Sequence, residues 1–178
     1  MSEMIAALKE EHANMRDLLD LIEREAKRPE GPDYGLLHEI MAYCRTYPDQ
    51  FHHPKEDLIY RAICRHDPRV TPAIDDLEAE HEELAIASRE FADLVEQGLT
   101  SGARPPAFTE IALAFVAQYR GHIEKEDREF FPSAVEILSP EEWQELGDQI
   151  SHPGDPLFYQ TAGDRLQALL SRKFDQAG

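Results

Sequence analysis

Two segments of the chain pair a histidine with a glutamate four residues later. His52 precedes Glu56 in the stretch HHPKED, and His122 precedes Glu126 in the stretch HIEKED. A step of four residues leaves two side chains only about 40° apart around a helix, so each pair lies on one face. Each pair therefore offers a neutral nitrogen and an anionic oxygen to a common ligand.

Four segments carry apolar residues at alternating steps of three and four, which is the pattern of helices that bury one face. We expect these helices over about residues 3–27, 34–64, 70–97 and 106–131. Each has one histidine on its apolar stripe, and these are His12, His52, His81 and His122. A lone histidine on a buried face is usually a hydrogen-bonded core residue, whereas four in matching positions favour a shared site.

The four histidines fall at one level if short loops join antiparallel helices. About 15 residues follow His12 in its helix and about 18 precede His52 in the next, or roughly 22 and 27 Å at about 1.5 Å per residue. About 12 residues then follow His52 in its helix, and about 11 precede His81 in the next. About 16 residues follow His81, and about 16 precede His122 in the fourth helix. We therefore expect all four imidazoles and both glutamates in one cross-section of a bundle.

Proline and glycine residues are expected to bend or end these helices. Pro48 and Pro54 fall inside the second segment, and a kink there is favoured over a break into two helices. Gly98 is expected to end the third helix, and Pro132 is expected to end the fourth.

The rest of the chain predicts further helices. Ser139, Pro140 and Glu142 have the spacing of an N-cap, a first helical residue and a capping box, and a last helix is expected over 157–174. The sequence shows no internal repeat and no period-two alternation of strands. We expect an all-α fold: an antiparallel up-down four-helix bundle over residues 1–135, with one or two additional C-terminal helices in 136–178 that pack on it as part of one structural domain.

Composition excludes several classes of partner. The chain has 178 residues, with 18 basic against 36 acidic residues and a formal net charge of -18, so nucleic acid and anionic membranes would be repelled. A leader pattern and a membrane-length apolar run are both missing, and a cytoplasmic location is expected. Cys44 and Cys64 alone cannot form a disulfide framework or a thiolate zinc site.

A metal pair would explain why carboxylates occupy the buried stripes. Burying Glu56 and Glu126 without partners would be costly, and no lysine or arginine lies on these stripes at that level. Imidazole and carboxylate ligands together suit iron, manganese or zinc, and a nitrogen-rich set with carboxylates is typical of di-iron sites. Six side chains cannot fill two octahedra, so small molecules would occupy the remaining positions.

Four stretches of the chain resemble the hemerythrin-like HHE cation-binding domain, and these are EEHANM, FHHPKEDLIY, EAEHEEL and HIEKEDREFFP. The resemblance spans about residues 5–132, and the C-terminal extension is similar to that of bacterial members. It implies a non-haem di-iron centre that binds dioxygen, nitric oxide or another small oxidant such as peroxide. It also implies bridging roles for both glutamates and a ligand set of His12, His52, Glu56, His81, His122 and Glu126.

One position departs from the oxygen-carrying hemerythrins, which have a fifth histidine four residues after the one on the third helix. This chain has Ala85 there, so the resemblance favours the sensing, iron-handling and stress-response members over reversible carriers. Three hypotheses stay open at this point. The chain is a binding module for a small oxidant or for iron, an enzyme that reduces peroxide or nitric oxide, or a metal-free bundle for phosphotransfer or scaffolding. It acts as a monomer or a homodimer.

Two ligand assignments have alternatives. Oxygen carriers use a final histidine and aspartate five residues apart, so Asp127 competes with Glu126, which we favour because its spacing repeats that of the second helix. His53 and Asp57 form a parallel pair about 100° away around the helix. We expect that pair at the edge of the bundle, and the alternative is that it replaces the neighbouring pair as ligands.

Overall fold

Helices dominate the described part of the chain. The computed structural model describes residues 3–66 and 77–150. Its α-helices are α1 (Glu3–Ala26), α2 (Tyr34–Cys44), α3 (His53–His66), α5 (Leu77–Ser101), α6 (Phe108–Lys125), α7 (Phe131–Ile137) and α8 (Pro140–Gln149). Two π-helical turns precede α3 and α7, and these are η1 (Pro48–His52) and η2 (Glu126–Phe130). No strand occurs in these two stretches, and the predicted all-α class is confirmed.

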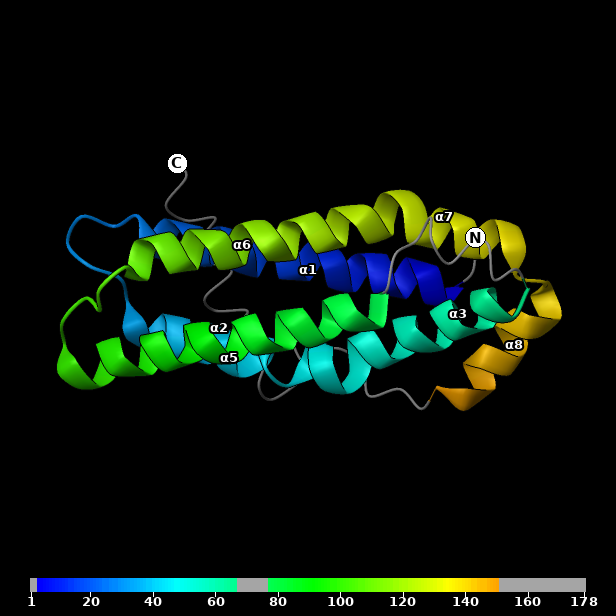
Figure 1. Ribbon diagram of the computed structural model, residues 1–178, viewed down its shortest axis with the longest axis horizontal. Helices are drawn as coiled ribbons and strands as arrows, with labels where there is room; N and C mark the ends of the chain where they lie inside the picture. The colour runs from blue at the N-terminus through cyan, green and yellow to red at the C-terminus, as the bar shows by residue number, and fades with distance from the viewer. Residues whose placement is uncertain (1–2, 67–76, 151–178) are drawn as a thin grey trace.

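The helices form an antiparallel up-down bundle (Figure 1). The first helix, α1, packs on α2 and α6, and α5 packs on α2, α3 and α6. One rod contains α6, η2 and α7 in succession, and α8 crosses the end of the bundle against α3. The predicted bundle with a C-terminal addition is therefore confirmed. The helix expected over 157–174 and the start of the third segment, 70–76, lie outside the described residues. The division at residue 135 stays a prediction.

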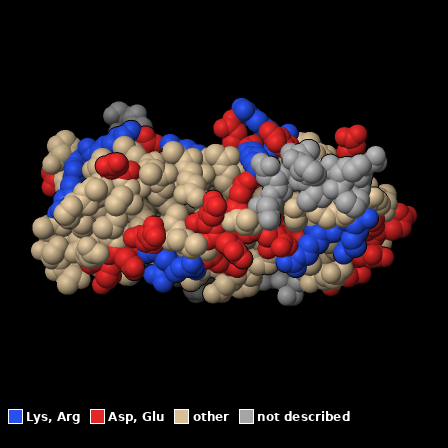
Figure 2. All heavy atoms as spheres, in the orientation of Figure 1, with Lys and Arg blue, Asp and Glu red and all other residues tan. Residues whose placement is uncertain are grey.

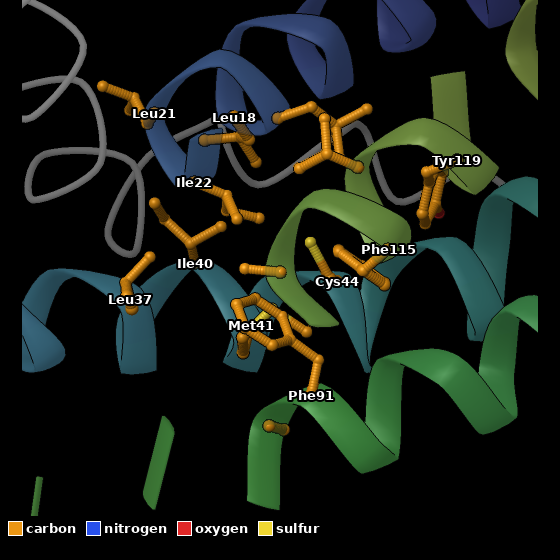
Figure 3. Packing of buried hydrophobic residues seen from close by; sticks show 14 of the residues in the cluster. Leu18, Leu21, Ile22, Leu37, Ile40, Met41, Cys44, Phe91, Phe115 and Tyr119 are labelled. Atoms are coloured by element: carbon orange, nitrogen blue, oxygen red, sulfur yellow. The ribbon is translucent and has the colours of Figure 1, made fainter. Parts of the chain in front are cut away.

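The apolar core has two separate parts. The larger cluster joins α1, α2, α5 and α6, and Figure 3 shows among its members Leu18, Ile22, Met41, Phe91 and Phe115. The smaller cluster lies at the other end of the bundle and includes Ile5, Leu8, Ile59, Phe130 and Phe131. Each fully buried leucine, isoleucine or phenylalanine contributes about 1.5–3 kcal/mol relative to an exposed one. On α1, His12 falls between the residues of the two clusters, and this is where the polar residues gather.

The second segment is interrupted more strongly than predicted. Helix α2 ends at Cys44, and the Thr46 hydroxyl just beyond it donates to the Ala42 carbonyl at 2.7 Å. The chain then passes through η1 before α3 begins at His53. The prediction of one kinked helix over 34–64 was therefore wrong, since two α-helices share this span.

The π-helical turns explain how the chain accommodates two prolines. Each turn has a backbone hydrogen bond between residues five apart. The His53 amide donates to the Pro48 carbonyl, and the Phe131 amide donates to the Glu126 carbonyl. Pro54 and Pro132 each occupy the second position of the α-helix that follows, where a missing N–H is tolerated. The last rod runs on to Ile137, so the prediction that Pro132 ends it was wrong.

Gly98 has a packing role in α5. The helix continues to Ser101, so the predicted end at Gly98 was wrong. A Cβ atom added to Gly98 would lie 2.2 Å from Cε1 of the Tyr34 ring, which is closer than side chains can approach. Gly98 therefore lets α2 pack tightly on α5. The left-handed residue after the helix is Gly102, with φ of 67°.

The short helix α8 begins as predicted. The Glu142 amide donates to the Ser139 hydroxyl at 3.3 Å, and the Ser139 amide donates to the Glu142 carboxylate at 2.9 Å. The second oxygen of Glu142 lies 2.6 Å from Nε2 of His66 at the end of α3. One carboxylate therefore caps α8 and joins it to the bundle.

The surface carries the acidic excess. Figure 2 shows acidic side chains spread over one face, with basic side chains in groups between them. Among the residues that the structure describes, no helix is long and apolar enough to cross a membrane. The cytoplasmic location stays a prediction.

Candidate metal centre

A layer of buried polar side chains crosses the bundle between the two apolar clusters. We call it the polar layer, and it consists of His12, His52, His53, Glu56, His81, His122 and Glu126. Its members are between 0% and 6% exposed. The structure thus brings together the six residues singled out from the sequence, and His53 joins them.

Glu56 lies between two groups of imidazoles. Its Oε1 is 3.4 Å from Nε2 of His12 and 3.2 Å from Nε2 of His52. Its Oε2 is 3.5 Å from Nε2 of His81. Each oxygen of this carboxylate therefore faces a different group.

Glu126 spans the same two groups from the opposite helix. Its Oε2 is 3.2 Å from Nε2 of His12, whereas its Oε1 is 3.4 Å from Nε2 of His81 and 3.2 Å from Nε2 of His122. Both glutamates consequently direct one oxygen to each of the two groups of imidazoles. His12 and His52 form one group, which we call the first imidazole group, and His81 and His122 belong to the second.

Several inward atoms are left without hydrogen bonds. Among the described residues, no hydrogen-bond partner reaches Nε2 of His12 and of His122, either carboxylate oxygen of Glu56, or Oε2 of Glu126. Each such buried atom costs about 1–3 kcal/mol. Two donors on one metal ion, each bound at about 2.1 Å, are about 3.0 to 3.4 Å apart at octahedral and tetrahedral angles. The nitrogen–oxygen separations of 3.2 to 3.5 Å are close to this range, so the donor set fits metal ions.

Two overlapping groups of residues can each hold an ion. One contains His12, His52 and Glu56, and the other contains His53, Glu56, His81 and His122. Within each group, one ligand atom per residue lies within 4.8 Å of all the others. Glu56 belongs to both groups, which agrees with its position between the imidazoles.

Four of the imidazoles turn their other nitrogen toward a carboxylate. The Nδ1 atoms lie 2.6 Å from Glu11 for His52, 2.8 Å from Asp57 for His81, 3.1 Å from Glu80 for His122 and 3.2 Å from Asp127 for His12. Such contacts fix the ring and direct Nε2 inward as the free donor. We call the carboxylates of Glu11, Asp57, Glu80 and Asp127 the outer carboxylates. Sequence reasoning missed their role. The signal was present, since each outer carboxylate directly precedes a stripe histidine or directly follows a stripe glutamate.

Asp127 takes this outer position. Its Oδ1 faces Nδ1 of His12, and its Oδ2 accepts from Arg16. The Asp127 side chain is 21% exposed, whereas that of Glu126 is 1% exposed and faces three imidazoles. This geometry favours Glu126 over Asp127 as the inward donor, in agreement with the helical spacing.

Lysine side chains lie outside two of the carboxylates. Lys55 donates to Glu11 at 2.9 Å, and Lys125 donates to Glu80. Burial raises the pKa of Glu11, but His52 and Lys55 outweigh it and lower that pKa to about 2. The Glu11 carboxylate is therefore charged, and it can accept a hydrogen bond from the His52 imidazole and orient that ring.

Burial and charge compete in the metal-free layer. Burial lowers the pKa of His81, but hydrogen bonds to Asp57 and Glu126 and the carboxylate charges raise it to about 10. Burial likewise lowers the pKa of His122, and Glu126 raises it to about 9. Burial raises the pKa of Glu126, yet His122, His12 and His81 hold it well below its usual value. Imidazolium protons thus supply the positive charge that a bound cation would supply instead.

His53 does not lie at the edge of the bundle, so that prediction was wrong. It is 4% exposed, and its ring stacks on that of His81 with the centroids 4.1 Å apart. Its Nδ1 faces Asp49 at 3.6 Å. The extra residue in η1 changes the rotation of the chain, so two consecutive histidines can face inward. Burial, together with the neighbouring His81 and His52, lowers the pKa of His53 well below its usual value.

The remaining histidines differ from these. The side chains of His38 and His66 are 54% and 42% exposed, and His152 lies outside the described residues. Phosphotransfer needs a solvent-facing imidazole, so the buried histidines of the layer do not suit it.

A small pocket adjoins the polar layer on the side of the larger apolar cluster. His12, His52 and His53 line it together with Tyr119 and Ile123. The rings of Tyr119 and His122 lie 6.5 Å apart between centroids. On the side of the smaller cluster, Phe131 stacks on His12 at 5.3 Å and closes the layer. The pocket therefore lies beside the imidazoles, on the side of the layer opposite Phe131.

Comparison with known proteins bears on this centre directly. The family model described as the hemerythrin HHE cation binding domain matches residues 3–134 of the 178-residue chain. No curated protein and no solved structure was found to match. The matched region contains every residue of the polar layer, whose buried histidines and glutamates can hold a metal ion. This chain therefore belongs to the hemerythrin HHE cation-binding domain family.

Proposed function

We propose that this chain is a non-haem di-iron protein that binds dioxygen, nitric oxide or a related small oxidant, in oxidant sensing or iron handling. Its metal ligands would be His12, His52, Glu56, His81, His122 and Glu126. In this proposal the first imidazole group holds one ion, the second holds the other, and both glutamates are shared.

One observation carries the proposal. Each glutamate directs one oxygen to the first imidazole group and the other oxygen to the second, at separations of 3.2 to 3.5 Å. Three of these four oxygens have no hydrogen-bond partner among the described residues. Carboxylates placed in this way suit bridging between two ions better than pairing with each other.

Iron is supported by the chemistry of the donor set. The layer is rich in nitrogen and contains no thiolate, which favours iron over a structural zinc site, with manganese and zinc as the other ions that such ligands accept. When bound, iron would supply redox chemistry and coordination positions that the protein leaves open.

The protein side chains hold and shield the centre. The outer carboxylates orient the imidazoles, and Phe131 covers the layer on one side. Tyr119, 3% exposed, excludes water beside His122, where the pocket admits a small ligand.

Metal analysis of protein loaded anaerobically with ferrous iron tests the proposal. We expect about two iron ions per chain and new near-ultraviolet absorption after exposure to oxygen. His81→Ala should lose at least one ion, whereas His38→Ala, which removes an exposed histidine, should keep both. Wild-type protein that retains no iron and shows no spectral change would refute the di-iron assignment.

Kinetics separate a binding protein from an enzyme. Stopped-flow mixing of the reduced, iron-loaded protein with nitric oxide or dioxygen should give one stoichiometric reaction without turnover. Sustained consumption of peroxide or nitric oxide, with a reductant present, would identify the centre as an enzyme instead.

A further inference from the structure

Met15 brings a sulfur atom to the pocket beside the polar layer. It lies on α1 three residues after His12, about 4.5 Å further along the helix axis and on the same face. Its side chain is 5% exposed and belongs to the larger apolar cluster. Met15 also lines the pocket together with His12, His52 and His122. Among the described residues it is the one sulfur-containing side chain in that wall, although a leucine would fill a similar volume.

A second sulfur atom lies next to the first. The Cys44 thiol of α2 donates to Sδ of Met15 at 4.0 Å, and Cys44 is 1% exposed. Burial, with a smaller effect from the charge of Asp49, raises the pKa of Cys44 to about 12, so the thiol keeps its proton at neutral pH. Peroxides oxidise the thiolate form of cysteine, whereas the thioether of methionine reacts without losing a proton. Met15 is therefore the reactive sulfur of this pair, and Cys44 is an S–H donor held beside it.

We propose that Met15 is an oxidation site, at which hydrogen peroxide held at the iron-loaded polar layer transfers one oxygen atom to Sδ. This inference rests on the proposed function and adds a covalent product of the encounter with the oxidant. In the transfer, the O–O bond of the peroxide breaks and an S–O bond forms. The sulfur loses two electrons, the peroxide gains them, and the second oxygen atom leaves with both protons as water. The product is methionine sulfoxide, and the balance requires no change in the charge of the iron.

The position of Met15 explains why the loaded layer is needed. With 5% of its surface exposed, the side chain is shielded from peroxide in bulk solvent. About one helical turn separates it from His12, and a methionine side chain has three rotatable bonds, so Sδ can approach a molecule held beside His12. Phe131 closes the opposite side of the layer with a hydrocarbon ring. The sulfur therefore lies on the side of the layer where the pocket is found.

Oxidation would change the contact between α1 and α2. The sulfoxide oxygen is polar, and a polar atom in an apolar cluster is costly unless it accepts a hydrogen bond. The Cys44 thiol, which donates to Sδ in the reduced protein, is placed to donate to the new oxygen. The modified protein should therefore remain folded with a lower stability, which would make Met15 a reporter of exposure to peroxide.

The other methionines of the chain supply matched controls. Met41 belongs to the same apolar cluster and is 2% exposed, but it does not line the pocket. Met4 is partly buried beside the smaller cluster, at the other end of the bundle. Met15→Leu removes the sulfur and preserves the volume, and Cys44→Ala removes the S–H donor. Circular dichroism reports whether each variant folds, and metal analysis reports whether it holds as much iron as wild type.

Peptide mass spectrometry after treatment with hydrogen peroxide locates the added oxygen. Protein loaded with iron and then oxidised is compared with chelator-treated protein at the same few equivalents of peroxide. We expect Met15 sulfoxide to form about tenfold faster or more in the loaded protein. Met4 should react at the same rate in both proteins, and Met41 should stay unmodified.

Three results would decide against the proposal or its basis. Loaded protein that holds two irons and forms no Met15 sulfoxide, or forms it no faster than metal-free protein, would overturn the assignment of the oxidation site. Equal oxidation of Met15 and Met41 in the loaded protein would indicate diffusing radicals and would also overturn it. Wild type that binds no iron would instead refute the proposed function itself.

Chemical denaturation of the peroxide-treated protein, after removal of the metal, measures the consequence. Treated wild type should unfold at a lower denaturant concentration than untreated wild type, whereas Met15→Leu should show no such fall. Cys44→Ala should show a larger fall on oxidation than wild type, because the new oxygen has lost its donor. An unchanged midpoint in protein fully converted at Met15 would contradict the effect on stability, and equal falls in wild type and Cys44→Ala would contradict the role of the thiol.

Discussion

Glu11 offers a quantitative test of the outer carboxylates, because it contacts a proposed ligand without being one. Its side chain is 11% exposed, and its two oxygens lie 2.6 Å from Nδ1 of His52 and 2.9 Å from Nζ of Lys55. We predict that Glu11→Gln and Glu11→Ala both weaken metal binding at the first imidazole group while leaving every proposed ligand in place.

The size of the effect follows from the two contacts. A hydrogen bond to a charged group contributes about 1.5–3 kcal/mol, and about 1.4 kcal/mol corresponds to a tenfold change in affinity. Glutamine keeps one acceptor oxygen, so Glu11→Gln should weaken metal binding roughly tenfold. Alanine removes both contacts and leaves the ammonium group of Lys55, which is 7% exposed, without the carboxylate, so Glu11→Ala should weaken it roughly a hundredfold.

Competition with a coloured chelator measures these affinities for cobalt(II), which avoids oxidation during the titration. Glu10→Gln makes the same charge change at an exposed neighbouring position and should have no effect. Glu80→Gln, the same change at the carboxylate that faces His122, should have a smaller effect than Glu11→Gln, because the Glu80 side chain is 29% exposed and its contact to His122 is longer, at 3.1 Å. Equal affinities for Glu10→Gln and both Glu11 variants would refute the orienting role of the carboxylate.

Two further predictions concern the fold. Gly98→Ala should lower the free energy of unfolding by about 1–3 kcal/mol, because the new Cβ atom meets the Tyr34 ring, and chemical denaturation of the metal-free protein measures it; an unchanged or higher value would contradict the packing role. The pKa values of His81, about 10, and His122, about 9, lie above the ordinary 6.5, so their protonated forms stabilise the metal-free fold fully below pH 6.5, and this contribution is lost as the pH rises toward 9 and 10. Denaturation midpoints of chelator-treated protein should therefore fall between pH 7 and 10, and a flat or rising profile would contradict the network.

The level of the centre was predictable because it depends on robust features of the chain. The distances from His12, His52, His81 and His122 to the predicted helix ends match in a bundle of antiparallel rods with short loops. An error of a few residues in a predicted helix end changes the expected height of a side chain along the bundle by less than two turns. The inaccurate boundary at Gly98 therefore did not change the predicted level of the histidines. The prediction that these histidines lie on the apolar stripes required only the helical period.

The rotation of one side chain was not predictable from that period. A constant step of about 100° per residue places His53 away from His52, but η1 inserts one residue just before His53 and changes the phase. Pro54 signals that the helix is disturbed, yet a break, a kink and a π-helical turn all satisfy a proline. The outer carboxylates were missed for another reason, since their positions off the apolar stripe are those of ordinary solvated residues.

The separation of the apolar core into two clusters has a consequence for how the protein comes apart. Few apolar contacts join the two ends of the bundle, because the buried polar and charged side chains of the polar layer lie between the two apolar clusters. Bound ions would cross-link the helices at this layer and so connect the two ends. Chelation would then turn one cooperative unit into two that open independently. Hydrogen exchange would then speed up in α7 and α8 while the amides of α2 stay protected, so loss of metal would register first as fraying at a single end.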